Sequence, residues 1–175
     1  MKTTLEDLKK RRSIRAFKSE QITDAELDQI LEVGTFAPSG ANMQSAVIVV
    51  AQEPLLIRQL EELNARVLKN PQAHPFFGAP TVLSILVDIT KATPVEDGAL
   101  VIGNLLHAAA ALGIGSCWIH RAKEVFASPE GQALLRTWGL GEQYIGVGHC
   151  ILGYPADPDY PPQAAPRKAG YIIKV

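Results

Sequence analysis

Hydrophobic and polar positions along the chain predict helices and strands mixed throughout its length. Leucines and isoleucines recur every three or four residues in several stretches, which is the spacing of a helix with one buried face. Thr23 and Glu26 form a capping-box pattern at the start of one such stretch. The expected helices cover about residues 24–36, 54–69 and 96–112, with shorter ones ending near Arg11 and beginning at Ser128.

Other apolar stretches are rich in β-branched residues, which predicts strands. Val47–Val50 and Thr81–Val87 are apolar on both faces, so we expect both to be buried. Tyr144–Leu152 is a further predicted strand, and its internal glycines indicate a close approach of neighbouring atoms. Ser116–His120 is expected to be a short strand or loop. The proline-rich segment Pro155–Pro166 is expected to be an extended arm. It leads to Gly170–Lys174, a final predicted strand suited to pairing with another subunit.

Composition and charge narrow the class of protein. The length of 175 residues predicts a single domain covering residues 1–175, with 47% hydrophobic and 20% charged residues, as is ordinary for a globular chain. The formal net charge of −1 argues against binding to nucleic acid or an anionic membrane. Two cysteines are too few for a disulfide scaffold, and neither a signal peptide nor a long apolar span is visible. We therefore expect a cytoplasmic protein.

A basic cluster stands out in this nearly neutral chain. Arg11-Arg12-Ser13-Ile14-Arg15 places three guanidiniums and a hydroxyl within five residues. Because arginine presents a planar fork of donors that matches phosphate oxygens, the segment is a candidate phosphate receptor. The alternative is a solvated basic helix end that only complements the helix dipole.

Metal and nucleophilic chemistry have weaker support. Cys117, His120, His149 and Cys150 include a Cys-x-x-His spacing found in zinc sites. However, His149 and Cys150 are adjacent in a predicted strand, where successive side chains point to opposite faces, so we expect no metal site. Cys117 lies in an apolar segment and is expected to be an inert core thiol. The sequence has no Gly-x-Ser-x-Gly, Walker or Gly-x-Gly-x-x-Gly motif.

The remaining polar features suit a flat, phosphorylated heterocycle. The basic cluster and the pair Arg167-Lys168 suit a phosphate, the loop Ser39–Gln44 offers amides and hydroxyls, and Trp118 offers a planar wall. Together these motifs resemble the FMN-dependent nitroreductase family, of which this chain would be a short, single-domain member. The resemblance covers nearly the whole chain and is carried by Arg11–Phe17, Ala37–Gln44, Gly113–Ile119 and Pro166–Tyr171, which match in order and spacing.

The resemblance implies an α+β, nitroreductase-like fold with helices around a mainly antiparallel sheet. It also implies a homodimer that exchanges its C-terminal arm and strand and binds two FMN molecules at the subunit interface. Arg11, Arg12, Ser13 and Arg15 would bind the phosphate and ribityl chain or approach the ring, and Arg167 and Lys168 would join them at the phosphate. Pro38, Ser39, Gly40, Asn42 and Gln44 would come from the partner subunit, and Trp118, Ile119 and His120 would line the ring, with a backbone N–H facing flavin N5.

The activity implied by the resemblance is an FMN-dependent NAD(P)H oxidoreductase. The flavin would accept hydride from NADH or NADPH and pass it, in a ping-pong cycle, to a nitroaromatic, a quinone or a similar small acceptor. One alternative is a non-catalytic flavin-binding carrier or sensor. Another is a basic adaptor for an acidic or phosphorylated partner, which would need no flavin.

Several residue roles remain open at the level of sequence. Arg15 is the candidate cation at the pyrimidine edge of the flavin. His120 is either a proton donor or a positional or core histidine. Phe76 and Phe77 would cover the substrate face of the flavin, with at least one of them expected in the core. Ser45-Ala46 stands where the family commonly has Pro-Trp, so the substrate-facing wall and part of the dimer contact are not carried over from the resemblance. The chain is also short for the family and has little room for inserted helices over the acceptor pocket, so we expect an open substrate site.

Overall fold

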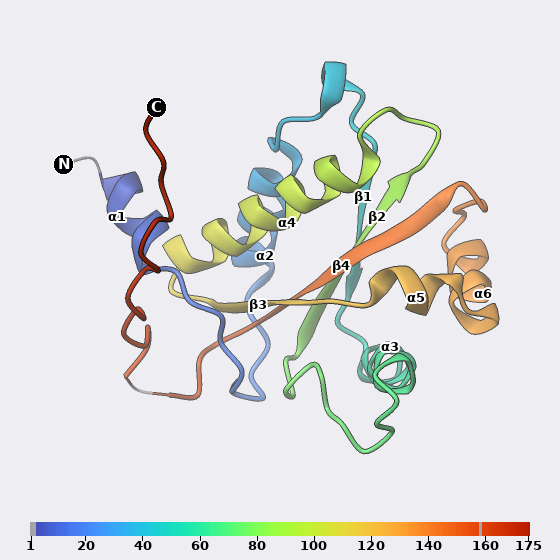
Figure 1. The fold of residues 1–175 in the computed structure, drawn as a ribbon. Coiled ribbons are helices and arrows are strands. Elements are labelled where there is room, and N and C mark those ends of the chain that lie inside the picture. Colours follow the sequence, from blue (N-terminus) through green and yellow to red (C-terminus); the bar gives the residue numbers. More distant parts are fainter. Residues whose placement is uncertain (1–2, 158) are drawn as a thin grey trace.

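The structure is a computed structural model that describes residues 3–157 and 159–175. Its centre is a four-stranded antiparallel sheet with the order β1-β2-β4-β3 (Figure 1). The strands are β1 (Ala46–Ala51), β2 (Thr81–Asp88), β3 (Gly115–Ile119) and β4 (Tyr144–Gly153). The helices are α1 (Thr3–Lys10), α2 (Asp24–Thr35), α3 (Pro54–Val67), α4 (Pro94–Ala111), α5 (Ala122–Ala127) and α6 (Pro129–Thr137), with a short 3-10 helix, η1 (Gly40–Asn42). The predicted α+β class and antiparallel sheet are confirmed.

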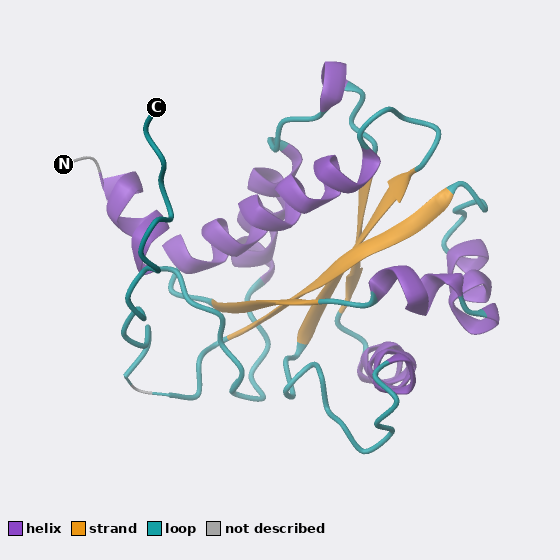
Figure 2. Cartoon of the chain, viewed as in Figure 1, coloured by secondary structure: helices purple, strands orange, loops and turns teal. Residues whose placement is uncertain are grey.

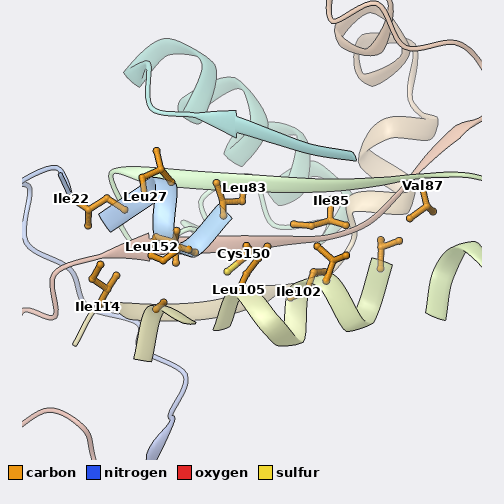
Figure 3. Packing of buried hydrophobic residues seen from close by; sticks show 14 residues of the cluster. Ile22, Leu27, Leu83, Ile85, Val87, Ile102, Leu105, Ile114, Cys150 and Leu152 are labelled. Carbon is orange, nitrogen blue, oxygen red and sulfur yellow. The ribbon is translucent and has the colours of Figure 1, made fainter. Parts of the chain in front are cut away.

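Helices cover both faces of the sheet (Figure 2). On one face, Leu83 of β2 and Cys150 of β4 belong to a cluster with Ile102 and Leu105 of α4, which Figure 3 shows, together with residues of α2. On the other face, β2 and β4 pack with α3, α5 and α6 around Phe126. Among the described residues, no helix is both long enough and apolar enough to cross a membrane.

The edge strand β1 is less buried than its sequence predicts. Val47–Val50 are apolar on both faces, yet these residues are half-buried and Val50 is 37% exposed. The reason is position, because β1 ends the sheet and pairs only with β2 among the described strands. The central strand β2, by contrast, is buried from Thr81 to Val87, as predicted.

The pleat of β4 separates His149 from Cys150, as predicted. The His149 ring lies 5.2 Å from the Phe76 ring, and its Nδ1 lies 2.9 Å from the Ser84 hydroxyl. Cys150 packs on the opposite face, in the cluster with α2 and α4. Burial, and then the charge of Arg121, lowers the pKa of His149 to about 3, so its imidazole is neutral near pH 7.

The C-terminal tail differs from its prediction at its far end. After Pro155, the described residues form no helix or strand, which suits the predicted arm. Gly170–Lys174 was expected to be a strand and is not one within this chain. Ile172 and Ile173 are 77% and 83% exposed. The physical reason is that a strand needs a neighbour for its backbone hydrogen bonds, and the described part of the chain supplies none to this segment.

Candidate functional site

The basic segment after α1 is fixed to the edge strand β3. The Ile14 N–H donates to the Ser116 carbonyl at 2.9 Å, and Ser13 and Ser116 form an isolated parallel bridge. The Ile14 side chain is buried, whereas Arg15 is exposed. Because successive side chains point to opposite sides of an extended segment, Ile14 anchors it in the core while Arg15 stays at the surface beside β3.

Several donors in this region lack acceptors. Arg11 Nη1, Arg12 Nε and Ser116 Oγ are buried and have no hydrogen-bond partner among the described residues. Arg12 Nη1 donates to the Lys9 carbonyl at 2.8 Å, which fixes the guanidinium against the end of α1. Buried donors without acceptors are unfavourable, so the region is suited to an anion that accepts from them. Arg11 also acts on a neighbouring group: burial, and then the positive charge of Arg11, lower the pKa of His107 on α4.

A pocket of about 390 Å³ lies beside this segment, and we call it the Arg15 pocket. It brings together five residues expected at the flavin, Arg15, Phe77, Trp118, Ile119 and His120, and its lining also includes Arg121. A smaller cavity of about 260 Å³ continues past Ser13 and Arg15 to Asp157 and Tyr160 of the tail. Arg15 lines both cavities and belongs to the same short segment as Arg11 and Arg12, whose Nη1 and Nε respectively lack acceptors. Cavities beside a segment with spare guanidinium donors suit a phosphorylated planar heterocycle.

The structure decides some of the open roles in this pocket. His120 is exposed, so the interpretation of His120 as a core histidine is wrong. Phe76 is 1% exposed and belongs to the core, whereas Phe77 is 38% exposed and lines the pocket. The Trp118 ring packs closely over Gly148, where an added Cβ would lie 2.7 Å from its Nε1. The close approach predicted from the β4 glycines is thereby confirmed.

A second pocket, of about 380 Å³, is lined by Pro38, Ser39 and Gln44 together with residues of α2, β1 and α4. The loop that carries these residues is held by one buried acid, Asp97, at the start of α4. Asp97 accepts hydrogen bonds from the Gly40 N–H at 3.0 Å and from the Ser45 hydroxyl at 2.8 Å.

A third donor, the Thr93 hydroxyl, lies 2.9 Å from Asp97. Burial raises the pKa of Asp97, but the three hydrogen bonds together outweigh burial, so the pKa lies below its usual value. The carboxylate is therefore ionised near pH 7 and is a firm acceptor for the loop.

The backbone of this loop is unusual. Ala41, Asn42 and Gln44 all have positive φ, at 48°, 55° and 47°. At Gly40 an added Cβ would overlap the Thr93 hydroxyl, which would have to move from its position beside Asp97. Clustered left-handed residues are costly and are found mainly at functional sites.

Within one chain, the loop and the basic segment are far apart. The loop is tied to the N-terminal turn of α4, whereas Ser13 pairs with β3, which follows the C-terminal end of α4 (Figure 1). The 18 residues of α4 span about 27 Å. A ligand that touched both within one chain would therefore have to span a distance comparable to the length of α4.

The tail residues Arg167 and Lys168 make local contacts. Arg167 donates to the Ala165 carbonyl, and the Lys168 ammonium lies 5.5 Å from the centre of the Tyr171 ring. Among the described residues, no hydrogen bond or ion pair joins either side chain to the basic segment. The structure therefore does not bring this second basic pair to the first.

Four residues of these two sites were missed by sequence reasoning: Asn64, Asp97, Ser45 and Arg121. Asp97 did carry a signal in the sequence, because it stands in the first turn of an apolar helix. An acid that such a helix buries needs hydrogen bonds to its carboxylate, which points to nearby donors. Ser45 appeared only as a departure from a family pattern. Asn64 and Arg121 meet across 57 positions, which local pattern cannot reveal.

Comparisons with known proteins agree with this geometry. A model of the Nitroreductase family matches residues 8–154. A relative from Archaeoglobus fulgidus, provisionally named an NADH dehydrogenase/NAD(P)H nitroreductase, is 30% identical over 161 residues, which is 90% of this chain and 88% of that protein.

Two solved structures are similar over the whole chain. A nitroreductase from Bacteroides fragilis with bound FMN has a TM-score of 0.90 and 28% identity, with 100% of both chains covered. A nitroreductase from Desulfitobacterium hafniense, also with bound FMN, has a TM-score of 0.85 and 26% identity, with 100% of this chain and 99% of that chain covered.

Proposed function

Because the chain belongs to the nitroreductase family, we propose that it is an FMN-dependent NAD(P)H oxidoreductase. The observation that carries the proposal is the pair of buried, unpartnered guanidinium nitrogens on Arg11 and Arg12, in the segment that continues into Arg15 of the Arg15 pocket. Two similar structures contain FMN, and a Bacillus subtilis relative, 23% identical, is named FMN reductase [NAD(P)H].

The chain's own residues would divide the ligand between them. Arg11, Arg12 and Ser13 would bind the phosphate and the ribityl chain, with the tail's Arg167 and Lys168 joining them when the tail is held by a second subunit. Arg15 would lie at the ring, where a cation stabilises negative charge on the pyrimidine edge. The segment from Trp118 to His120 would line the ring.

A homodimer completes this site in our proposal. Pro38, Ser39, Gly40, Asn42 and Gln44 of one subunit would meet the basic segment of the other, which agrees with their separation within one chain. Exposed apolar side chains on the elements next to this loop include Phe36 at the end of α2, which is 77% exposed, and Leu100 of α4, which is 47% exposed. The exposed Ile172 and Ile173 would gain a neighbour for the missing strand by exchange between subunits.

Bound FMN would supply hydride transfer from NADH or NADPH to an acceptor, in two half-reactions at one site. The protein would position both reactants in turn in the Arg15 pocket, against Phe77 and the backbone of β3. Nitroaromatics and quinones are the acceptor classes that we propose. The buried, free Cys117 and Cys150 agree with a reducing compartment, and we propose the cytoplasm.

The visible spectrum of the purified protein tests this function. A yellow protein that is bleached anaerobically by NADH or NADPH, and regains its colour with a nitroaromatic or a quinone, is the expected result. A yellow protein that neither nicotinamide bleaches would favour a flavin carrier or sensor. A colourless protein that also fails to bind added FMN would contradict the proposal.

A further inference from the structure

Arg121 holds a backbone conformation that favours glycine. It lies two residues after the end of β3, and its φ of 78° is in the left-handed region. This conformation is unfavourable for an arginine, because its Cβ crowds the backbone. Strained residues of this kind cluster at ligand sites, so the side chain at this position needs a reason beyond the turn itself.

The Arg121 guanidinium is oriented by a buried partner. Its Nε donates to the Asn64 side-chain oxygen at 3.0 Å. Asn64 is fully buried, and its own amide group donates to the His120 carbonyl at 2.8 Å. The other two guanidinium nitrogens, Nη1 and Nη2, have no partner in the described part of the chain and are not sealed from solvent. One edge of the fork is therefore fixed, and the other is free to bind.

The free edge belongs to a pocket of positive character. Arg121 lines the Arg15 pocket together with Arg15, His74 and His120, and no Asp or Glu is among its described lining residues. The acid next to these lining residues is Glu61, whose carboxylate lies 3.4 Å from His74 Nδ1 and so faces His74. Arg121 has no acidic partner of its own among the described residues.

The rest of the wall is apolar and includes Leu68, Pro75 and Phe77. A flat apolar body that carries one anionic group matches both halves of the pocket. We propose that Arg121 is a specificity residue: the reactant that meets the flavin carries a carboxylate or a phosphate, which Nη1 and Nη2 bind as a pair of donors. This inference rests on the proposed function, because it concerns which reactants enter that site.

Benzoate and benzamide give a direct test, since they have nearly the same shape and only benzoate is charged. We would titrate each into the FMN-loaded protein by calorimetry. The wild type is expected to bind benzoate at least tenfold more tightly than benzamide, as charged hydrogen bonds allow. In Arg121→Gly, which suits the left-handed backbone, the ratio should fall severalfold even though Arg15 still lines the pocket, and Arg121→Lys should keep more of it than Arg121→Gly does.

Lys123→Gln is the matched control, because Lys123 is an exposed cation nearby on α5 that does not line the pocket. Its ratio of benzoate to benzamide affinity should equal that of the wild type. Equal binding of the two probes by the wild type would overturn the proposal, as would an unchanged ratio in Arg121→Gly.

Steady-state kinetics then identify which reactant carries the anion. If it is the acceptor, Arg121→Gly should lower the kcat/KM ratio of 4-nitrobenzoate to 4-nitrobenzamide about tenfold. If it is the 2′-phosphate of NADPH, the kcat/KM ratio of NADPH to NADH should fall instead. A change in neither ratio would overturn the proposal. Benzoate binding needs no turnover, so a protein that binds benzoate through Arg121 but is not reduced by NADH or NADPH would contradict the proposed function alone.

Discussion

The Asp97 carboxylate accepts a hydrogen bond of 3.0 Å from the backbone N–H of Gly40, although 57 positions separate the two residues in the chain. The same carboxylate accepts from Ser45, at the other end of the loop. One buried acid at the start of α4 therefore fixes the loop from Gly40 to Ser45. A loop held in this way is preorganised, so a ligand that uses it does not have to order it.

Asp97→Asn is expected to loosen this loop. The amide would present N–H groups to donors that need an acceptor, so we expect a loss of about 1–3 kcal/mol in the free energy of unfolding. The affinity for FMN should fall as well, because the loop is proposed to complete the partner's site. Urea denaturation and FMN titration measure the two effects. The neighbouring exposed Glu96, changed to Gln, removes the same charge and should alter neither quantity appreciably.

Stability should depend on pH through His149. Its folded-state pKa of about 3 lies below the usual unfolded value of about 6.5, so the unfolded chain binds the proton more readily. This contribution therefore lowers stability as pH falls through 6.5, by about 1.5 kcal/mol between pH 6.5 and 5. Urea midpoints at several pH values should show the dependence reduced in His149→Leu. They should show it retained in Ser84→Ala, which removes a hydrogen bond and no titrating group.

Two glycines should respond oppositely to alanine. At Gly148 the new Cβ would lie 2.7 Å from Trp118 Nε1 and 3.0 Å from Ile102 Cδ1, so Gly148→Ala should cost about 1–3 kcal/mol through overpacking. At Gly103, inside α4, an added Cβ meets nothing within 4 Å. Gly103→Ala should stabilise by about 0.5–1 kcal/mol through helix propensity. Thermal unfolding of both variants checks the pair. If the two variants shifted the melting temperature equally and in the same direction, the contact between Gly148 and Trp118 would not be tight.

The two neighbouring phenylalanines should separate stability from activity. Phe76 is buried against the His149 ring, so Phe76→Ala should cost about 3–5 kcal/mol. Phe77 is partly exposed at the pocket, so Phe77→Ala should change stability by less than about 1 kcal/mol and instead raise KM for aromatic acceptors. Chemical denaturation combined with steady-state assays distinguishes the roles. A large loss of stability in Phe77→Ala would contradict this division.

The sequence predicts the elements of this fold well, because their signals are local. The Thr23–Glu26 capping box begins α2, and the apolar run from Thr81 to Val87 is the buried central strand. Segments at the edge of the sheet are predicted less well. Neither the partial exposure of β1 nor the missing strand at Gly170–Lys174 can be read from local pattern, because both depend on which neighbours pair with the segment.

The candidate site shows the same limit. Arg15 and His120 carry motif signals, and the structure places them in one pocket. Asn64 has no such signal, since an asparagine within a helical pattern is indistinguishable from a surface residue until the fold buries it against Arg121. Contacts between distant segments, which arise from tertiary packing, are therefore what sequence reasoning missed.

The central claim is that Arg11 and Arg12 bind the phosphate of FMN, and comparing FMN with riboflavin tests it most directly, because the two ligands differ only in that phosphate. Dissociation constants measured on the apoprotein should favour FMN by about a hundredfold, as two charge-assisted contacts allow. Arg11→Gln and Arg12→Gln should each remove much of this preference, whereas Lys10→Gln, at an exposed position, should keep it. Equal affinity of the wild type for FMN and riboflavin, or a preference unaffected by either arginine, would contradict the account.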